Sequence, residues 1–451
     1  MRRSLVLALG LPALLAVVQQ QWLLRQPPRL ITLRQAPASS GPAALQARFS
    51  RPMVGTSLQH ASALQPPLLH RWLGRGSQLL LTLGEHERIR APLQLKIAGR
   101  DFRGLPLIPS RWRWDPRPRV VAVVRVPGGE QLQLRDHDGR WQPISPAWPA
   151  IPVMLPLGDG SGVVAASRMP DGRLRLWRIP IRQVNLKQLT PPGNDLGHEP
   201  GSRPVAGSLQ ALRSEPVIFA HFSSNRHGDL VMQSGGLDPG SSETRLLPTG
   251  GGSQLLPWRA SGPLRLVPEG GAVLVPDTDG LNLQALPPQP PRRQTLPGSR
   301  DLSSFCPQAG RALLVRHWPD FRRSLELVEP GQSPRQLWVG TEAVLSTACS
   351  RGGQRVWVLL LDGIRQPQLS VLVLDNLGRQ LARRVLKGWE AEPGTGLHWD
   401  PSTGQLLAVL RPAVDRNQRR QPARAVLIDS RRLGLRVLQP EVRQADWLPA
   451  G

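Results

Sequence analysis

The sequence predicts an all-β protein with a short hydrophobic helix at the N-terminus, then a small β-sandwich, then a β-propeller. Three observations carry this prediction. The 451 residues include 44 Gly and 48 Pro, a content typical of many turns and few long helices. Beyond the N-terminus the apolar runs are only strand-sized, and Val356–Leu361 is the most apolar of them. A short phrase leading into such a run recurs about every 45 residues, the period of a propeller blade.

Residues 1–28 are predicted to be an export signal. Arg2 and Arg3 precede the uncharged apolar run Leu5–Val18, which is the order found in secretory signals. The two arginines favour a cytoplasmic N-terminus with the rest of the chain translocated. A cleaved signal peptide and an uncleaved signal-anchor in the inner membrane are both open. We therefore expect an exported protein, periplasmic or otherwise extracytoplasmic.

Residues 29–110 predict a small β-sandwich. A Pro- and Ser-containing linker, residues 36–42, leads into the expected strand Ala43–Phe49. Two further expected strands are Leu79–Leu83 and Leu93–Ile97, and apolar residues alternate in the second of them. Several short strands over about 75 residues suit a sandwich of two small sheets.

Two motifs of this segment resemble a bacterial family of Ig-like domains, the SbsA type. The strand end Arg48–Met53 contains Phe-Ser-x-Pro-Met, and the turn Asp101–Leu107 reads Asp-Phe-Arg-Gly-Leu-Pro-Leu, which resembles the family's closing turn Asp-x-x-Gly-x-Leu. The resemblance covers residues 30–109. It implies a spacer or adhesive module of exported proteins and carries no catalytic residues.

Residues 111–451 carry the repeat, in which a bulky apolar anchor is followed by a turn with Pro or Gly and then by a strand. The anchors are Trp114, Leu155, Phe222, Val267, Cys306, Cys349, Trp399 and Trp447. Their seven intervals favour seven blades, with six or eight open, because the last copy could supply a strand that closes the ring on the first blade. The longest interval predicts an insertion near residues 180–204, where Pro191–Asp195 is rich in turn residues.

The anchor phrase resembles the repeat of TolB-like propellers, in which Trp-Ser-Pro-Asp-Gly precedes an apolar strand. The best matches are Trp399–Gly404 and Trp447–Gly451. This resemblance implies the propeller fold and does not imply an activity.

Motifs for catalysis and for cofactors are missing from the sequence. None of the three Lys lies in a Gly-rich phosphate loop, no Ser has Gly on both sides at two residues' distance, and no His-Glu-x-x-His occurs. The pairs Asp136 with Asp138 and Asp277 with Asp279 lack the further acidic residues of a calcium loop, so we expect hairpin turns there. We therefore predict no catalytic residue, no cofactor and no metal site.

Two pairs of residues occupy equivalent places in different repeats. His221 and His398 each precede an anchor, so they could lie at similar depths in the ring. Cys306 and Cys349 are both anchors of neighbouring repeats. In an oxidising compartment the two cysteines could form a disulfide if their Cα atoms come within about 7 Å, and two buried free thiols are the alternative.

The formal net charge of +25 comes from 54 Arg and only three Lys. A basic patch is conceivable near the end of the chain, formed by Arg416, Arg419, Arg420, Arg424, Arg431 and Arg432. Residues with A/T-rich codons are scarce throughout, however, and no Tyr accompanies the arginines as a stacking platform. The charge is therefore attributed to genome composition, and nucleic acid is not expected as a partner.

The sequence favours a non-catalytic scaffold or binding protein of the cell envelope. The propeller surface would hold an envelope protein or a glycan, and the N-terminal segment would contact the membrane. One alternative is a propeller-type glycan hydrolase or lyase, which would need acidic residues or His converging at the channel mouth. A second alternative is a polyanion-binding protein.

Overall fold

The computed structural model describes residues 19–22, 25–38, 41–189, 203–258, 262–278, 280–306, 310–363, 367–413 and 421–450. Residues 1–18, which carry the apolar part of the predicted export signal, lie outside the described residues. In the part that the structure describes, no helix is both long enough and apolar enough to cross a membrane. The chain divides into unit 1, Met1–Asp115 with Asn185–Leu196, and unit 2, Pro116–Val184 with Gly197–Gly451.

Unit 1 contains a sandwich of two four-stranded antiparallel sheets and the short helix α2 (Gly55–Ala61). The first sheet has the order β1 (Leu30–Ala36), β2 (Ala44–Phe49), β5 (Gln78–Leu83), β4 (His70–Leu73). The second sheet has the order β14 (Leu186–Leu189), β7 (Ser110–Trp114), β6 (Leu93–Ile97), β3 (Ala63–Gln65).

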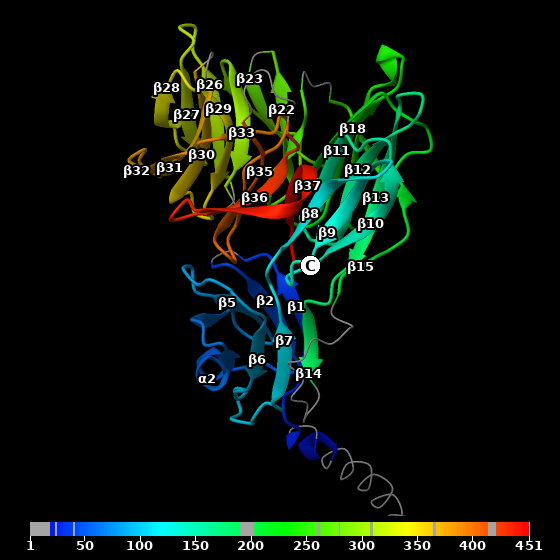
Figure 1. The fold of residues 1–451 in the computed structure, drawn as a ribbon. Coiled ribbons are helices and arrows are strands. Elements are labelled where there is room, and N and C mark those ends of the chain that lie inside the picture. The colour runs from blue at the N-terminus through cyan, green and yellow to red at the C-terminus, as the bar shows by residue number, and fades with distance from the viewer. Residues whose placement is uncertain are drawn as a thin grey trace, which may run out of the picture. The chain divides into compact units, whose positions relative to one another are not determined.

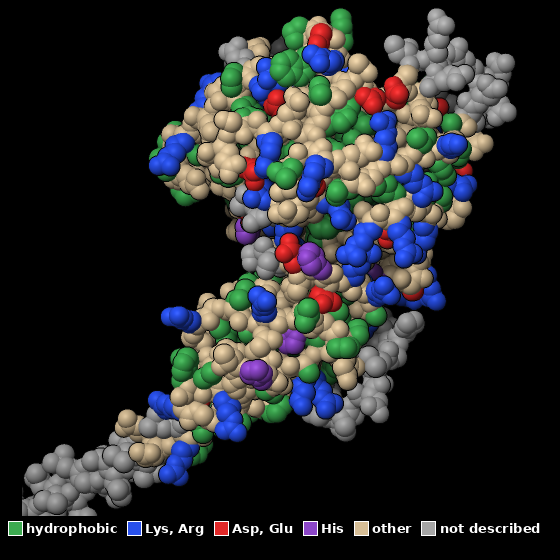
Figure 2. All heavy atoms as spheres, turned by 90° about the vertical axis from the view of Figure 1, so that its left-hand side faces the viewer, with side chains coloured by type: hydrophobic (Ala, Val, Ile, Leu, Met, Phe, Trp, Pro, Cys, Tyr) green, Lys and Arg blue, Asp and Glu red, His purple; other side chains and the backbone are tan. Residues whose placement is uncertain are grey.

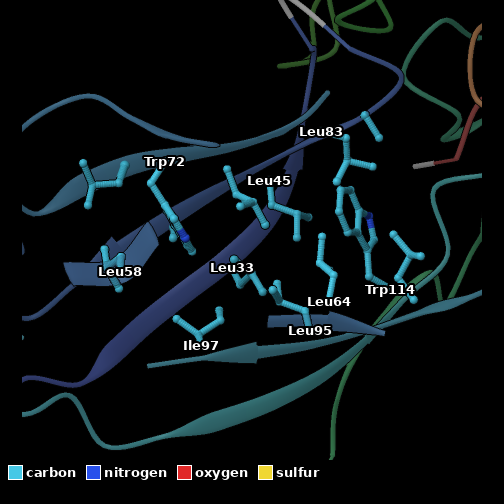
Figure 3. Close-up of a cluster of buried hydrophobic side chains, with 14 of the residues drawn as sticks. Leu33, Leu45, Leu58, Leu64, Trp72, Leu83, Leu95, Ile97 and Trp114 are labelled. Carbon is cyan, nitrogen blue, oxygen red and sulfur yellow. The ribbon is translucent and has the colours of Figure 1, made fainter. Parts of the chain in front are cut away.

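The core of unit 1 lies between its two sheets. In β6 the residues Leu93, Leu95 and Ile97 are fully buried, while the intervening side chains face outwards, as the period of two along a strand requires. Trp114 at the end of β7 is 0% exposed and packs in the same cluster. Figure 3 shows Trp114, Trp72 and the surrounding leucines directed into this shared core. The predicted sandwich is thus present.

The fourth strand of the second sheet comes from far along the chain. Residues Leu186–Leu189 follow a propeller strand and pair with β7 in the register Leu186↔Trp114 to Leu189↔Arg111 (Figure 1). Part of the insertion predicted near residues 180–204 therefore forms a strand of unit 1, and residues 190–202 lie outside the described residues.

Unit 2 is a β-propeller, and its described residues form seven blades. In most of them the four strands pair in chain order, each antiparallel to the next. For six of the seven pairs of neighbouring blades the first strands contact one another, so the first strands are the innermost ones. Four blades have four strands each in chain order: blade 3, β17 (Phe219–Ser224), β18 (Leu230–Gly235), β19 (Glu243–Leu247) and β20 (Gln254–Leu256), with the short 3₁₀ helix η2 (Pro239–Ser241) between β18 and β19; blade 4, β21 (Arg265–Leu266), β22 (Ala272–Asp277), β23 (Gly280–Ala285) and β24 (Arg293–Pro297); blade 5, β25 (Arg300–Phe305), β26 (Ala312–His317), β27 (Arg323–Val328) and β28 (Arg335–Gly340); and blade 6, β29 (Ala343–Cys349), β30 (Arg355–Asp362), β31 (Gln368–Asp375) and β32 (Gln380–Val385).

Blade 2 has three long strands, β11 (Val153–Pro156), β12 (Gly162–Arg168) and β13 (Leu174–Arg182), and the short strands β15 (Val205–Ala206) and β16 (Gln210–Ala211) both lie beside β13. Blades 1 and 7 share β37 (Leu435–Leu448): blade 1 has its second part with β8 (Arg119–Val126), β9 (Gly129–Arg135) and β10 (Trp141–Trp148), and blade 7 has β33 (Trp389–Ala391) and β34 (His398–Asp400), both beside β35 (Gln405–Pro412), then β36 (Arg424–Asp429) and the first part of β37.

The ring closes through the long strand β37, which belongs to two blades. Its first part pairs with β36, in the register Ile428↔Leu435, and its second part pairs with β8, in the register Arg119↔Leu448 (Figure 1). The last strand of the chain is therefore the innermost strand of the first blade. This closure removes the two free sheet edges of an open ring, and it confirms the predicted ring of seven blades.

One predicted anchor was wrong. Trp114 belongs to the core of unit 1, and the anchor of blade 1 is Trp447, which pairs with Val120. The phrase Trp114-Asp115-Pro116 copies Trp399-Asp400-Pro401 in sequence. The difference lies in the strand before it, because β7 pairs with β6 and β14 of unit 1. Chain order therefore starts the first blade at its second strand.

Candidate functional site

The propeller has two faces that differ in the loops they carry. Hairpins between the second and third strands of a blade lie on one face together with the connections to the next blade. We call this face the BC face. The hairpins between the first and second strands and between the third and fourth lie on the opposite side, the AB face.

Blade 5 presents an exposed aromatic side chain at the tip of its BC hairpin. Phe321 is 88% exposed and adopts a left-handed backbone conformation with φ 64°. The N–H of Phe321 donates to the carbonyl of Trp318 over 3.1 Å, which closes the turn. A left-handed backbone conformation costs free energy for a bulky residue. The ring of Phe321 is not buried, so hydrophobic burial does not offset this cost.

The matching hairpin of blade 2 shows what this turn normally requires. There Gly172 occupies the place of Phe321, with φ 84°, and its N–H donates to the carbonyl of Met169 over 3.0 Å. In both turns an arginine donates from Nε to an aspartate two residues earlier, Arg173 to Asp171 and Arg322 to Asp320. Phe321 therefore replaces the favoured glycine in an otherwise identical turn.

Blade 3 presents a second exposed apolar side chain on the BC face. Leu237, in the loop between β18 and β19, is 80% exposed. It borders a cavity of about 270 Å³ that Arg173, Arg213 and Asp238 also line. Among the described residues of unit 2, Phe321 and Leu237 are the two most exposed large apolar side chains.

A larger cavity, of about 430 Å³, opens between blades 4 and 5 on the same face. Its wall comes from the start of β21, the BC hairpin of blade 4 and the connection into β25. The lining includes Arg265, Asp277, Thr278, Ser299, Arg300 and Asp301. This volume lies in the range of small-molecule sites.

The charged groups of this cavity are paired, with one exception. Arg300 donates from Nε to Glu326 over 2.8 Å, and Asp277 pairs with Arg293 at 3.3 Å. Asp301 lies 2.8 Å from Nε2 of His317.

Arg265 is the exception, since its side chain forms no ion pair within the part of the chain that the structure describes and is exposed to solvent, while its backbone pairs with Leu274. The nearby protein atoms displace part of the water around the guanidinium and so lower its pKa. Partial burial and the nearby Arg265 together lower the pKa of His221, on the innermost strand of blade 3. Neither residue type nor spacing singles out Arg265 in the sequence.

The innermost strands of blades 7 and 1 are joined by a pair of titratable groups. Nδ1 of His398 lies 3.0 Å from Oδ1 of Asp446, and the indole N–H of Trp447 donates to the carbonyl of His398 over 3.1 Å. Burial raises the pKa of the Asp446 carboxyl, and the neighbouring His398 opposes that shift. The position before the anchor thus holds Asp446, His398 and His221 in three different blades. Within the described ranges, no group of three or more His, Cys, Asp or Glu is arranged to hold a metal ion.

Cys306 and Cys349 are joined by a disulfide in the structure, with Cα atoms 4.9 Å apart. Both residues are buried, Cys306 directly after β25 and Cys349 at the end of β29. The bond therefore links the innermost strands of blades 5 and 6. Although these strands belong to separate sheets, they approach closely enough for a disulfide to form.

The predicted basic patch is divided by the structure. Arg416, Arg419 and Arg420 lie outside the described residues. Arg424 begins β36, whereas Arg431 and Arg432 follow its end, so these described arginines lie at opposite ends of one strand. Figure 2 shows Lys and Arg side chains distributed among other residue types over the visible face.

The Asp pairs considered for calcium occupy hairpins. Asp136 accepts from Nε of Arg119 over 3.0 Å, and Asp138 accepts from the N–H of Arg140 over 3.1 Å. Asp277 is held by Arg293, and Asp279 lies outside the described residues.

Comparison with known proteins gives no family for this chain. No protein-family model matches it, and no curated protein matches it either. Similar solved structures include TolB from Acinetobacter baumannii, with 12% identity, a TM-score of 0.40 and coverage of 80% of this chain and 81% of that one. An uncharacterised protein from Listeria monocytogenes has 8% identity, a TM-score of 0.47 and coverage of 73% and 93%. The β-propeller domain of the Trilobed protease from Pyrococcus furiosus has 9% identity, a TM-score of 0.45 and coverage of 78% and 96%. The propeller assignment depends on the strand order described above, not on these similarities.

Proposed function

We propose that this chain is a non-catalytic binding protein that holds a partner, an envelope protein or a glycan, on the BC face of its propeller. The observation that carries the proposal is the display of Phe321 at 88% exposure in a backbone conformation that favours glycine. Strain of this kind persists where a function maintains it. Leu237 stands on the same face, and aromatic side chains such as Phe321 are enriched in protein interfaces.

The proposal includes a place outside the cytoplasm. The basic start and apolar run of residues 1–18 support export. The disulfide between Cys306 and Cys349 also supports it, because such bonds persist in oxidising compartments. The resemblance of unit 1 to SbsA-type Ig-like domains supports a spacer role for the sandwich.

The alternative of a glycan hydrolase or lyase has less support in this geometry. Glycoside hydrolysis ordinarily uses two carboxyl groups that flank the scissile bond. On the described innermost strands, Asp446 contacts the imidazole of His398 and Asp301 contacts that of His317, so each of these carboxyls faces an imidazole and not a second carboxyl. Polyanion binding has less support because the described members of the basic patch are separated along β36.

The test compares three forms of the full chain, each carrying an affinity tag and produced in the native cells, so that the partners of the cell envelope are present. The wild type, a Phe321→Gly/Leu237→Ser variant and a Leu377→Ser control are cross-linked in cells, and each is then purified. Leu377 is 57% exposed and lies in a hairpin of the AB face. Leu377→Ser therefore replaces an exposed leucine with serine, as Leu237→Ser does, but leaves the BC face unchanged. A glycan array read with the same three proteins covers the second class of partner.

We expect a partner or glycan that the wild type and the Leu377→Ser control both retain and that the double variant loses. Equal recovery by all three proteins would remove the BC face from the proposal. Turnover of a glycan by the wild type would contradict the non-catalytic assignment.

A further inference from the structure

One end of unit 1 is formed by segments that meet where the chain enters this unit. The N–H of Ile108 donates to the carbonyl of Pro28 over 3.2 Å, and the N–H of Ser50 donates to the carbonyl of Arg29 over 2.9 Å. The start of β1, the end of β2 and the connection between β6 and β7 therefore lie together (Figure 1). We call this end of unit 1 the entry end.

The entry end displays apolar side chains to solvent. Phe102 is 69% exposed and Ile108 is 48% exposed, and both lie in the connection between β6 and β7. The turn that carries Phe102 is held in place, because Oδ1 of the buried Asp101 accepts from the N–H of Arg103 over 2.9 Å and from that of Leu105 over 2.8 Å. Exposed apolar groups with a polar rim mark surfaces that contact a protein or a membrane.

The charges of unit 1 are divided between its two ends. The hairpin between β4 and β5 also belongs to the entry end, since the N–H of Met53 donates to the carbonyl of Gly76 over 3.0 Å. Each segment of this end carries basic residues, namely Arg29, Arg51, Arg75, Arg100 and Arg103. Among the described acidic residues of unit 1, Asp101 alone lies there, and it is buried. The others lie at the opposite end, before β6 or after β7, and are Glu85, Glu87 and Asp115.

Two further basic residues lie directly opposite each other beside the entry end. Lys96 of β6 and Arg111 of β7 are cross-strand partners, and both are exposed. Like charges in this position destabilise a sheet, so the fold alone does not favour the pair. Genome composition accounts for the many arginines but not for Lys96, which is one of only three lysines in the chain. This local excess of positive charge is complementary to a negatively charged surface.

The neighbouring sequence indicates which negatively charged surface fits. The apolar run Leu5–Val18 shortly precedes Pro28 in the chain, and Trp22, a residue type enriched at membrane interfaces, lies between them. Apolar side chains with basic neighbours are the combination that binds anionic bilayers. The apolar groups enter the headgroup region, and each Lys or Arg near the surface adds electrostatic attraction.

From this arrangement we infer that the entry end of unit 1 docks on an anionic phospholipid bilayer. Phe102 and Ile108 enter the headgroup region, and the basic residues around them contact the lipid phosphates. The inference goes beyond the proposed function, because it assigns a second partner, to unit 1, and does not involve the BC face.

The test follows a fluorophore on the full chain, reconstituted in lipid nanodiscs. The two native cysteines form the disulfide, so a nitrobenzoxadiazole label can be attached to one introduced cysteine. Pro106→Cys places the label at the entry end, and His86→Cys places it in the connection before β6, at the opposite end. The label brightens when it leaves water. The discs contain either phosphatidylcholine alone or phosphatidylcholine mixed with phosphatidylglycerol.

Two variants remove the proposed contacts, and two controls make similar changes elsewhere on unit 1. Phe102→Ser/Ile108→Ser removes the apolar groups, and its control is Leu69→Ser. Leu69 is 75% exposed, and its carbonyl accepts from the N–H of Gly84 over 2.7 Å, at the opposite end. Arg100→Gln/Arg103→Gln removes two charges from the entry end, and Arg34→Gln/Arg90→Gln removes two charges away from it.

We expect the Pro106 label to brighten in discs that contain phosphatidylglycerol and the His86 label to stay dim. In the two entry-end variants, the ratio of docked to undocked protein should fall by roughly tenfold or more. In the two controls it should match the wild type within about twofold. High salt should reverse the brightening of the wild type, because it screens the charges. Near-UV circular dichroism checks that each variant is folded.

Equal brightening of the two labels, equal brightening in the two kinds of disc, or wild-type brightness in Phe102→Ser/Ile108→Ser would overturn the inference. Heparin added to the phosphatidylcholine discs should leave the Pro106 label dim. Brightening as strong as that with phosphatidylglycerol would assign the entry end to a soluble polyanion instead. The lipid comparison uses the unchanged apolar and basic residues, so it decides the question even if a variant fails to fold. None of these results depends on Phe321, so the proposed function is tested separately.

Discussion

Nδ1 of His398 and Oδ1 of Asp446 meet at 3.0 Å, so the innermost strands of the last and first blades are joined by side chains as well as by ring closure. Both groups are partly shielded from water, with side-chain exposures of 35% and 20%. We expect a coupling of about 1 kcal/mol between them, which is more than a fully exposed pair provides. A double-mutant cycle of His398→Gln and Asp446→Asn, followed by urea unfolding at pH 6, measures it. Strictly additive effects of the two changes would show that the contact contributes nothing to ring closure.

His221 should make the propeller less stable in acid. Its pKa is lowered in the folded protein by partial burial and by Arg265, so below the unfolded value of about 6.5 the unfolded chain binds more protons. The free energy of unfolding is therefore highest above that pH and falls as the pH drops towards the lower folded value. We expect the stability of His221→Gln relative to the wild type to rise between pH 7 and pH 5. A difference that stays constant over this range would contradict the assignment.

Loss of the Cys306–Cys349 disulfide should destabilise unit 2. The bond closes a loop with a sequence separation of 43, for which loop-closure entropy gives about 4 kcal/mol as an upper value and about 2–4 kcal/mol is typical. The Cys306→Ala/Cys349→Ala variant should unfold at lower urea concentration than the oxidised wild type. Adding dithiothreitol should shift the wild type towards the variant and leave the variant unchanged. A wild type whose unfolding ignores the reductant would indicate free thiols.

Replacement of Phe321 by glycine should stabilise the protein while it weakens partner binding. The left-handed conformation at φ 64° costs a bulky residue about 1–2 kcal/mol, and the greater freedom of glycine in the unfolded chain offsets part of this gain. We expect a net gain of about 0.5–1 kcal/mol, measured by thermal unfolding. Phe321→Ala serves as the control, because it removes the ring and retains the strain. A lower melting temperature for Phe321→Gly would mean that the exposed ring makes stabilising contacts.

Trp114→Ala and Leu448→Ala should destabilise different units. Both side chains are 0% exposed, Trp114 in the core of unit 1 and Leu448 in the core beneath blades 1 and 2. We expect losses of about 3–5 kcal/mol for the first and 2–5 kcal/mol for the second. In differential scanning calorimetry, each change should lower the transition of its own unit. If Trp114→Ala shifted only the propeller transition, the assignment of Trp114 to unit 1 would be wrong.

The sequence predicts the repeating part of the fold because each blade repeats a local pattern. Phe222 and Trp399 lie within an innermost strand, and Cys349 and Cys306 lie at or directly after the end of one, as their spacing indicates. Trp114 misleads for the same reason, because its phrase is locally correct and only the strand before it differs in partner. A short stretch of sequence does not show which distant strand a given strand pairs with.

The candidate site was beyond the sequence for a different physical reason. The cavity that Arg265 lines is bounded by residues of blades 4 and 5, which only the folded chain brings together. Phe321 matters because of its backbone conformation, and a Phe in the phrase Pro319-Asp320-Phe321 gives no sign of a positive φ. A comparison with Met169–Arg173, where glycine fills the same place, was the one signal in the sequence that could have identified it.

The strand β14 ties the order of synthesis to the folding of unit 1. A nascent chain presents β1 to β7 first, but the edge of β7 stays unpaired until Leu186–Leu189 has been made, after the strands β8 to β13. An unpaired edge is a site where a second chain can add. During synthesis the sandwich therefore stays incomplete until the segment that follows the second blade's third strand is made, and a fragment ending at residue 110 would lack β14 and all but the first residue of β7.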